Sequence, residues 1–272
     1  MKQLKKGLLI AGLSAAMGFA STSAQAAFND FDVQEGAVDN TPDNLFTADK
    51  IIGNYVEVIT FNGDGSVDVS LKWEAGQYVA NDGVDPVTPT YLNNFEPAGY
   101  KLYALFQASG TFVLDGSGGA VFTFGSGGSL QLATDELSDT TFTAPATGAG
   151  AWTLGNTGDD DTLANGAAVS GTGVLDPTLP TCGDDGINCG SFGTTTSVAL
   201  TAFGSTFFVD PVPFYNLAFE SGQLNNFTPS GTQTINGSLD VVFGNVPEPS
   251  TLALMGLGMA GLGIMRRRKQ KS

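Results

Sequence analysis

The densest group of side chains that could do chemistry in this sequence is a run of three aspartates. Asp159, Asp160 and Asp161 follow Gly158 in a stretch rich in Gly, Asn and Thr. Closely spaced oxygen ligands are what Ca²⁺ takes in proteins, so the run is a candidate calcium site. The alternating Asp spacing and the distal Glu of an EF-hand loop are absent. The alternative is therefore a solvated acidic loop without bound metal.

The chain has no histidine, and this limits the catalysis open to it. A Ser or Cys nucleophile would have no imidazole base, and the commonest transition-metal ligand is missing. Two carboxylates could converge as in a glycosidase, but the sequence singles out no pair. Residues 125–128 are glycine-rich without the strand-to-helix context or the Lys-Ser/Thr ending of a phosphate loop. We expect a protein that is not an enzyme and has no cofactor, Ca²⁺ being the one candidate.

Residues 1–26 have the three-part layout of a secretory signal peptide. Three lysines lie within the first six residues, residues 7–20 are apolar, and residues 24–26 (Ala-Gln-Ala) form the small-residue cleavage site. The apolar run is shorter than the ~20 residues that a membrane-spanning helix needs, so a membrane anchor is the weaker interpretation. The mature chain is expected to begin at Ala27.

The two cysteines, Cys182 and Cys189, enclose the short sequence Gly-Asp-Asp-Gly-Ile-Asn. Export would deliver them to a compartment where disulfides persist, so we predict that they are bonded to each other. A metal site is the alternative, but two thiols without histidine or further cysteines fall short of a zinc ligand set.

Between residues 27 and 246 the chain is strongly acidic. This segment holds 26 acidic residues, no arginine and only three lysines (Lys50, Lys72 and Lys101), which gives a net charge of −23. Nucleic-acid binding draws most of its affinity from Lys and Arg on phosphates, so nucleic acid is excluded as a partner. The charge is explained by solubility and mutual repulsion, or alternatively by the attraction of divalent cations.

The same segment is rich in strand-forming residues and shows period-2 patterns. Residues 66–73 alternate between an apolar face and a polar face, and residues 55–61 alternate in the same way. The intervening Asn-Gly-Asp-Gly at 62–65 supplies the positive-φ residues of a tight turn, so the two stretches should form a hairpin. Further strands are expected at 101–114 with a bend at Gly110, 120–124, 129–133, 197–203, 206–209, 214–219 and 233–243.

Short strands at this spacing predict an all-β fold, because βαβ units would need helical crossovers. We expect one β-sandwich or jelly-roll-like domain over residues 27–246. Residues 143–196 hold few large apolar groups and are expected to form long Gly/Asp-rich surface loops.

The C-terminal tail, residues 247–272, has three consecutive parts. Pro247, Glu248 and Pro249 end the last strand, residues 250–265 carry no charge, and an Arg-Arg-Arg-Lys cluster follows at 266–269. As a helix the apolar part would span roughly 24 Å, at the short limit for a bilayer, with the basic cluster on the cytoplasmic side. The tail would serve as a handle for a membrane protease or, alternatively, as a plain anchor.

This order of parts, with the literal Val-Pro-Glu-Pro-Ser-Thr-Leu at 246–252, resembles a PEP-CTERM sorting domain. The resemblance implies a Gram-negative host that makes exopolysaccharide and secretion through the inner membrane, with transient insertion of the tail. It further implies processing by an exosortase, an integral-membrane cysteine protease, and delivery to the cell surface or extracellular matrix.

The acidic segment between residues 27 and 246, called the body below, also resembles the flocculation-associated PEP-CTERM proteins. The stretches that match are Phe-Asn-Asp-Phe at 28–31, Ala-Asp-Lys at 48–50, Tyr-Ala-Leu-Phe-Gln-Ala-Ser-Gly at 103–110, Gly-Asp-Asp at 158–160, Phe-Val-Asp-Pro at 208–211 and Gly-Thr-Gln-Thr at 231–234. The resemblance implies a role in cell aggregation within an exopolysaccharide matrix and supplies no binding residues.

Two other functions stay open. A carbohydrate-binding module, with or without calcium, would stack sugars on exposed aromatic rings, for which Phe95, Tyr100 and Phe227 are candidates. A glycoside-active enzyme would need two carboxylates about 5 to 10 Å apart across a cleft.

Overall fold

The structure is a computed structural model that describes residues 28–94, 98–182, 186, 188–221 and 224–244. These residues form an almost entirely β domain. In chain order its elements are β1 (Phe31–Gln34), η1 (Glu35–Ala37), β2 (Leu45–Ala48), β3 (Lys50–Phe61), β4 (Ser66–Ala80), β5 (Asp85–Pro86), β6 (Lys101–Leu114), β7 (Ala120–Phe124), β8 (Gly127–Asp135), β9 (Thr141–Thr143), β10 (Thr153–Gly155), β11 (Asp160–Leu175), β12 (Gly190–Leu200), α2 (Gly204–Phe207), β13 (Phe208–Asp210), β14 (Asn216–Ser221) and β15 (Gly231–Gly244). The predicted all-β fold is confirmed. The predicted signal peptide and C-terminal helix lie outside the described residues.

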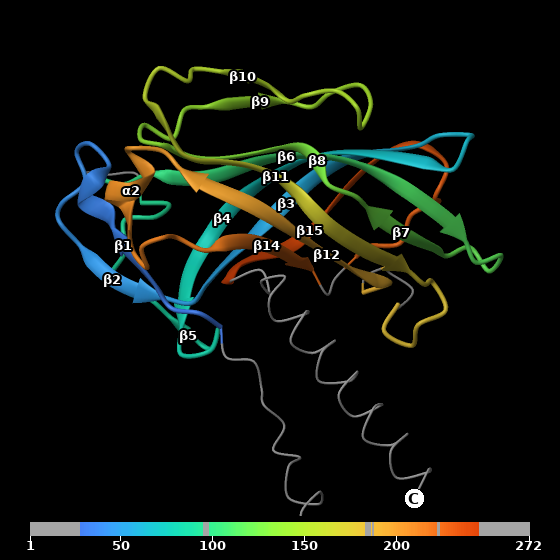
Figure 1. Ribbon diagram of the computed structural model, residues 1–272, viewed down its shortest axis with the longest axis horizontal. Coiled ribbons are helices and arrows are strands. Elements are labelled where there is room, and N and C mark those ends of the chain that lie inside the picture. The colour runs from blue at the N-terminus through green and yellow to red at the C-terminus, as the bar shows by residue number, and fades with distance from the viewer. Residues whose placement is uncertain (1–27, 95–97, 183–185, 187, 222–223, 245–272) are drawn as a thin grey trace, which may run out of the picture.

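The main sheet is antiparallel and closes on itself (Figure 1). Most strands pair with their neighbours in the chain, and β7 and β8 follow one another in the same position between β6 and β11. The pairing of β15 with β3 and that of β4 with β6 complete the circuit. In a sandwich, two separate sheets would pack face to face. Here the β15–β3 and β4–β6 pairings join the two halves into one continuous curved sheet, and all its inward faces line the same interior.

Large side chains from all sides fill the interior. Trp73, Phe106 and Phe219 are buried, and the Phe219 ring meets Trp73 edge to face and Phe106 at a tilt. The Trp73 indole N–H donates to the Leu239 carbonyl at 2.7 Å, which ties β4 to β15 over the intervening strand β3. The alternation that was visible in the sequence therefore places a packed aromatic core inside the closed sheet.

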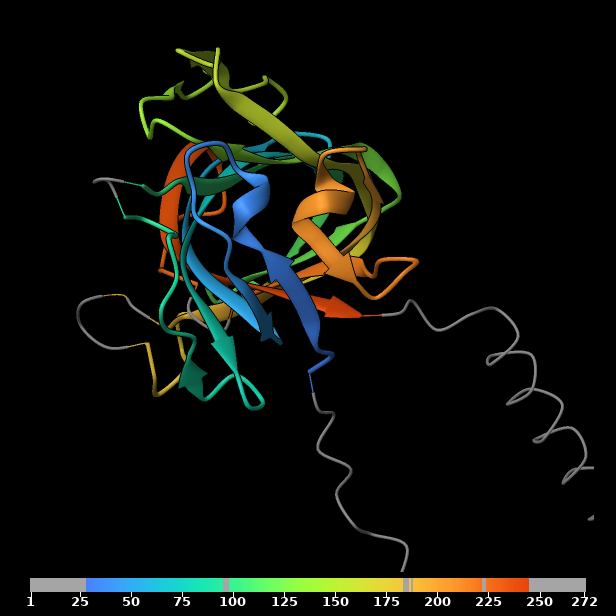
Figure 2. The ribbon, with the colours of Figure 1, turned by 90° about the vertical axis from the view of Figure 1, so that its left-hand side faces the viewer.

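A small second sheet covers one end of the closed sheet. Strands β13, β1 and β2 pair in that order, and β1, β2 and α2 lie across the opening in Figure 2. Phe31 of β1 meets Phe208 of β13 and Phe243 of β15 edge to face. The Asn29 side chain donates to the Phe243 carbonyl at 3.0 Å. The first and last described segments therefore meet at this capped end.

The predicted hairpin is confirmed. β3 and β4 pair in one register from Phe61 with Val67 to Gly53 with Ala75, and Gly65 in the turn has φ +85°. The Asn62 side chain donates to the Ser66 hydroxyl across the turn. Such a turn requires a residue at positive φ, a conformation that glycine adopts without steric cost.

The prediction of long loops at residues 143–196 is wrong. β10, β11 and part of β12 lie there, and β11 is the longest strand. One of its small residues is required by close approach, since a Cβ at Gly166 would overlap the Ser197 carbonyl of β12. The strand expected at 206–209 is also wrong in its first half, where α2 runs to Phe207.

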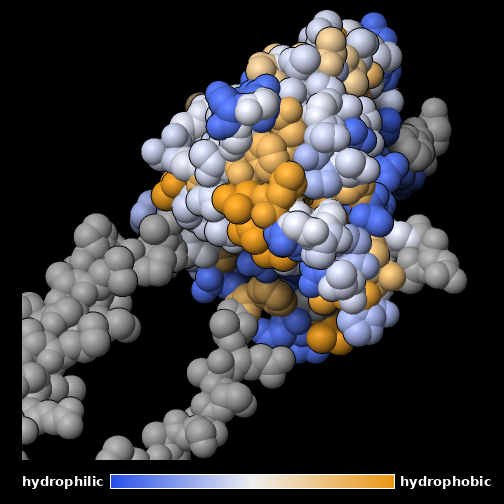
Figure 3. All heavy atoms as spheres, turned by 90° about the vertical axis from the view of Figure 1, so that its right-hand side faces the viewer, coloured by the Kyte–Doolittle hydropathy of each residue, from blue (hydrophilic) through white to orange (hydrophobic). Residues whose placement is uncertain are grey.

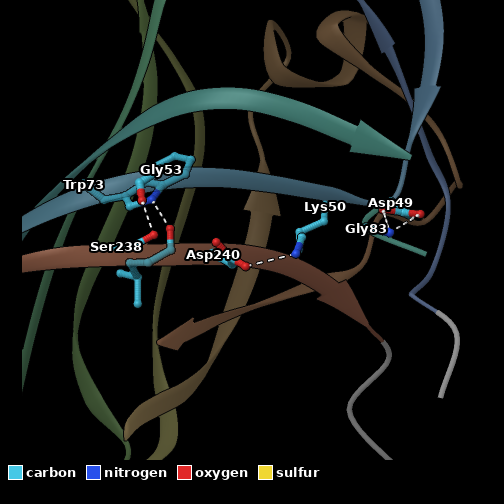
Figure 4. A network of polar contacts seen from close by, with 8 residues as sticks. Asp49, Lys50, Gly53, Trp73, Gly83, Ser238 and Asp240 are labelled. Carbon is cyan, nitrogen blue, oxygen red and sulfur yellow. Dashed lines mark hydrogen bonds and ion pairs between the residues drawn. The ribbon is translucent and has the colours of Figure 1, made fainter. Parts of the chain in front are cut away.

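Gly53 of β3 lies against the Trp73 indole, as Figure 4 shows. A Cβ there would fall well inside contact distance of the Trp73 Nε1 atom and the Glu74 carbonyl. Overpacking of this kind costs typically ~1–3 kcal/mol. We expect Gly53→Ala to lower the free energy of unfolding by about 2–3 kcal/mol in chemical denaturation. Gly63→Ala is the matched control, because its Cβ would meet nothing within 4 Å. Equal losses in both variants would contradict the packing argument.

Candidate functional site

Three carboxylates meet where β8 ends and β11 begins. Asp135, the last residue of β8, pairs with Asp160, the first residue of β11. Asp159 precedes this strand, and one carboxylate oxygen from each of the three residues lies within 4.8 Å of the others. Asp135 is fully buried and accepts hydrogen bonds from the backbone N–H groups of Asp139 and Thr140. These three residues are called the acidic cluster below.

The surroundings of Asp160 disfavour its charged form. Burial raises the pKa of Asp160, and the charges of Asp135 and Asp159 add to this rise. Hydrogen bonds from the hydroxyls of Thr140 (2.7 Å) and Tyr103 (2.8 Å) act in the opposite direction. A divalent cation between the three carboxylates would remove their mutual repulsion, and carboxylate oxygens are ligands that Ca²⁺ accepts.

Asp161 does not join the acidic cluster. Successive residues of a strand point to opposite faces, so Asp161 lies on the face of β11 opposite to Asp160. Burial and then the charge of Asp39 raise its pKa. Of the three consecutive aspartates in the predicted calcium site, the structure brings Asp159 and Asp160 together and adds Asp135.

Each of the three lysines has an acidic, aromatic or carbonyl partner. Lys50 pairs with Asp240 at 3.1 Å, as Figure 4 shows. Lys72 pairs with Glu74 and lies over the ring of Phe142. The Lys101 ammonium group donates to the carbonyl of a residue in the loop after β8. Every basic residue of the body is therefore engaged within it.

The hairpin of β9 and β10, residues 141–155, folds back over the outer face of the closed sheet and is called the flap (Figure 1). Its backbone is attached at two points. The Gly148 N–H donates to the Thr60 hydroxyl at 2.9 Å, and the Gln107 side chain donates to the Gly150 carbonyl at 2.8 Å. A Cβ at Gly148 would overlap the Asp68 carbonyl, so the flap lies directly on the sheet there.

Between the flap and the sheet is a cleft of about 380 Å³, here called the flap cleft. This volume is within the range of small-ligand pockets. The flap contributes Trp152, and the sheet contributes polar side chains from β4, β6, β8 and β11: Ser70, Gln107, Ser129, Gln131 and Asn165. None of the residues that line it carries a charge.

A buried acid, Glu57 of β3, faces the interior beside a much smaller cavity of about 10 Å³. Its neighbours across the sheet are Leu71 and Ile235, and burial raises the pKa of Glu57 to about 8. The cavity holds about one water molecule and no organic ligand.

Exposed apolar side chains gather at the end of the closed sheet opposite the cap, the end that Figure 3 faces. Val113 of β6, Val121 of β7 and Val174 of β11 are cross-strand neighbours in one row, and Leu114 follows. Val113 is 70% exposed. We call these four residues the distal patch.

Two of the aromatic residues expected to stack sugars are engaged in contacts within the domain. Tyr100 is fully buried, where its hydroxyl donates to Glu35, and Phe227 stacks on Phe61. Phe95 lies outside the described residues. Trp152 of the flap does line a cleft, and no sequence pattern indicated it because it stands in a Gly-rich stretch without a strand pattern.

The predicted disulfide is confirmed: Cys182 and Cys189 are bonded to each other. It closes the loop between β11 and β12. The three residues of the sorting motif, Pro247, Glu248 and Pro249, lie outside the described residues.

Comparison with known families bears on the tail. Residues 245–269 match the family model of the PEP-CTERM protein-sorting motif. The chain carries a PEP-CTERM sorting motif. No curated protein and no solved structure matches the chain.

The PEP-CTERM motif makes this an exosortase-targeted protein that is exported to the cell envelope or surface. The motif starts in the sequence directly after Gly244, the last residue of β15, which lies at the capped end of the domain. Neither short helix of the described residues has the length and apolar character needed to cross a membrane.

Proposed function

We propose that this protein is a non-enzymatic component of the surface or matrix of a Gram-negative bacterium, where it promotes cell aggregation within exopolysaccharide. The PEP-CTERM motif supports the export part of the proposal. The short sequence stretches shared with flocculation-associated PEP-CTERM proteins support the aggregation part.

The observation that best supports this role is that β15, which leads into the sorting motif, ends at the capped end of the domain and away from the distal patch. The motif follows Gly244 at the capped end, whereas the distal patch lies at the opposite end. A protein held through its C-terminus would present the distal patch away from the cell. Exposed apolar patches of this kind commonly mark contact surfaces.

Deletion of the gene tests the role directly. We expect the deletion strain to secrete its exopolysaccharide but to form fewer and smaller flocs, because the polysaccharide would lack its protein cross-links. Sedimentation of the culture measures flocs, and the sugar content of the medium measures secretion. Normal flocculation of the deletion strain would refute the proposed role.

The charge of the body suggests how cohesion works. With 26 acidic residues and three engaged lysines, two copies repel each other, and direct pairing with an acidic polysaccharide lacks a cationic partner. Divalent cations shared between carboxylates of the protein and the polysaccharide would supply the attraction. The acidic cluster is the best-formed single site for such a cation.

Chelation of calcium is therefore expected to disperse flocs far more than an equal ionic strength of sodium salt, because screening alone does not remove a bridging ion. Asp159→Asn with Asp160→Asn should weaken calcium binding in calorimetry. Asp161→Asn is the matched control, since its side chain lies outside the acidic cluster. If chelation changes nothing while purified protein still binds the polysaccharide, cohesion rests on direct sugar contacts.

Direct sugar contact is the second candidate function, that of a carbohydrate-binding module. The flap cleft favours it, because one indole and several neutral polar side chains line a space large enough for a small ligand. A glycoside-active enzyme is less well supported, because none of the described residues that line the flap cleft is a carboxylate.

A further inference from the structure

The polar side chains of the flap cleft stand in two rows across the sheet. In the first row Gln107 of β6 lies between Ser70 of β4 and Ser129 of β8. In the second row Gln131 of β8 pairs with Asn165 of β11. Alternate residues of a strand point to the same face, so both rows face the flap. The sheet therefore presents a set of neutral amides and hydroxyls beneath the indole of Trp152.

Two polar atoms of this cleft are buried without a hydrogen-bond partner. Among the described residues only three buried side-chain polar atoms lack one, and two of them, the Ser70 hydroxyl and the Trp152 indole N–H, belong to residues that line the flap cleft. The third is the Thr41 hydroxyl, outside the cleft. A buried polar group without a partner is costly, and such groups are rare in native proteins. A ligand that paired with both atoms would recover that cost.

We propose that the flap cleft binds a neutral saccharide unit of the exopolysaccharide. A sugar ring offers hydroxyl groups that both donate and accept, which suits Ser70 and the amides of Gln107 and Gln131. The apolar face of the ring suits the indole of Trp152. The absence of charged lining residues selects against uronic acids, whose carboxylate would be desolvated without a cationic partner.

Binding requires the Trp152 side chain to turn, because its N–H and the Ser70 hydroxyl are both covered in this structure. The flap permits this, since the contacts that hold it on the sheet come from the Gly148 N–H, the Gln107 side chain and the Phe142 ring and do not involve the Trp152 side chain. The indole would then change its surroundings when a sugar enters. Trp73, the other tryptophan of the chain, is fully buried inside the closed sheet and would not.

Tryptophan fluorescence therefore measures binding. The purified mature protein is titrated with neutral tetrasaccharides of glucose, mannose and xylose, with the purified exopolysaccharide, and with a uronic-acid tetramer. We expect a saturable change with at least one neutral tetramer and none with the uronic acid. The change should persist in high salt and under calcium chelation, because neither salt nor metal contributes to these contacts. Saturable binding of the uronic acid alone, or of no saccharide at all, would overturn the proposal.

Variants test whether the signal comes from this cleft. Trp152→Phe should abolish the fluorescence change and weaken binding in calorimetry about tenfold or more. Ser70→Ala should weaken binding about 5- to 10-fold, the ratio expected for one hydrogen bond. Because it removes an unpaired buried hydroxyl, Ser70→Ala should leave the denaturation midpoint unchanged or higher.

Thr41→Val is the matched control, since it removes the third unpaired hydroxyl at a position outside the cleft and keeps the size of the side chain. It should act on stability as Ser70→Ala does and leave binding unchanged. Equal binding by Ser70→Ala and the unaltered protein would overturn the assignment of the site. The inference deepens the proposed function, but its test uses purified protein, so loss of saccharide binding and normal flocculation of the deletion strain are separate outcomes.

Discussion

Replacement of Pro247, Glu248 and Pro249 by alanines is expected to leave most of the exported protein at full length in the inner membrane. The two prolines cannot continue a strand or a helix and so separate β15 from the apolar segment at 250–265. Alanines would remove this break and the literal sequence that the sorting motif is named for. The apolar segment would still insert, so the protein would reach the membrane but would not be released from it.

Immunoblots of inner-membrane and surface fractions measure this outcome, since loss of the tail shortens the chain. Three alanines at 270–272 are the matched control, because these residues follow the matched region at 245–269. We expect the control to be processed and delivered normally. Normal processing and delivery of the motif variant would refute the role given to Pro247, Glu248 and Pro249.

The part of the fold that could be predicted is the part whose inward and outward faces differ in polarity. Residues 66–73 alternate strictly, and they lie in β4 paired with β3 as expected. The closure of the sheet could not be predicted, because it depends on which distant strands pair. Each strand alternates between an apolar and a polar face whether the sheet is flat or closed, so the pairing of β4 with β6 left no separate signal in the sequence.

β11 and the first part of β12, before the strand predicted at 197–203, were missed for a different reason. Many of their positions hold Ala, Gly and Thr in place of large apolar residues, and at Gly166 and Gly190 a Cβ would overlap a backbone carbonyl of the partner strand. Hydrophobic periodicity detects buried area, and these strands bury little per residue. Low apolar content therefore indicated loops where the structure has its longest strand.

The candidate sites show the same limit. Asp159 and Asp160 could be found as neighbours in the chain, but Asp135 joins them only through the pairing of β8 with β11. Trp152 becomes notable only when the flap places it over the sheet beside Ser70. Chemistry that depends on long-range pairing has no local signal in the sequence.

Glu57 illustrates a third case, in which the alternation of the sequence indicated that the residue faces inward but not how burial changes its pKa. The alternation of residues 55–61 puts Glu57 on the inward face with Tyr55 and Ile59, and the structure buries it there. Burial raises the pKa of Glu57 from 4.5 to about 8, so the folded protein holds its proton where an unfolded chain would release it. Between these two values the folded state binds more protons than the unfolded state. The free energy of unfolding therefore falls as pH rises through this window.

We expect Glu57→Gln to remove this fall in the free energy of unfolding with rising pH. One pKa unit corresponds to ~1.4 kcal/mol, so the stability of the variant relative to the unaltered protein should rise by roughly 4 kcal/mol between pH 4.5 and pH 8. Any fixed cost of the buried amide shifts the whole curve and leaves its slope unchanged. Urea denaturation at a series of pH values measures the difference. Glu220→Gln, at an exposed position of β14, is the control and should stay within about 0.5 kcal/mol at every pH. A difference between Glu57→Gln and the unaltered protein that does not change with pH would mean that Glu57 is ionised inside the closed sheet.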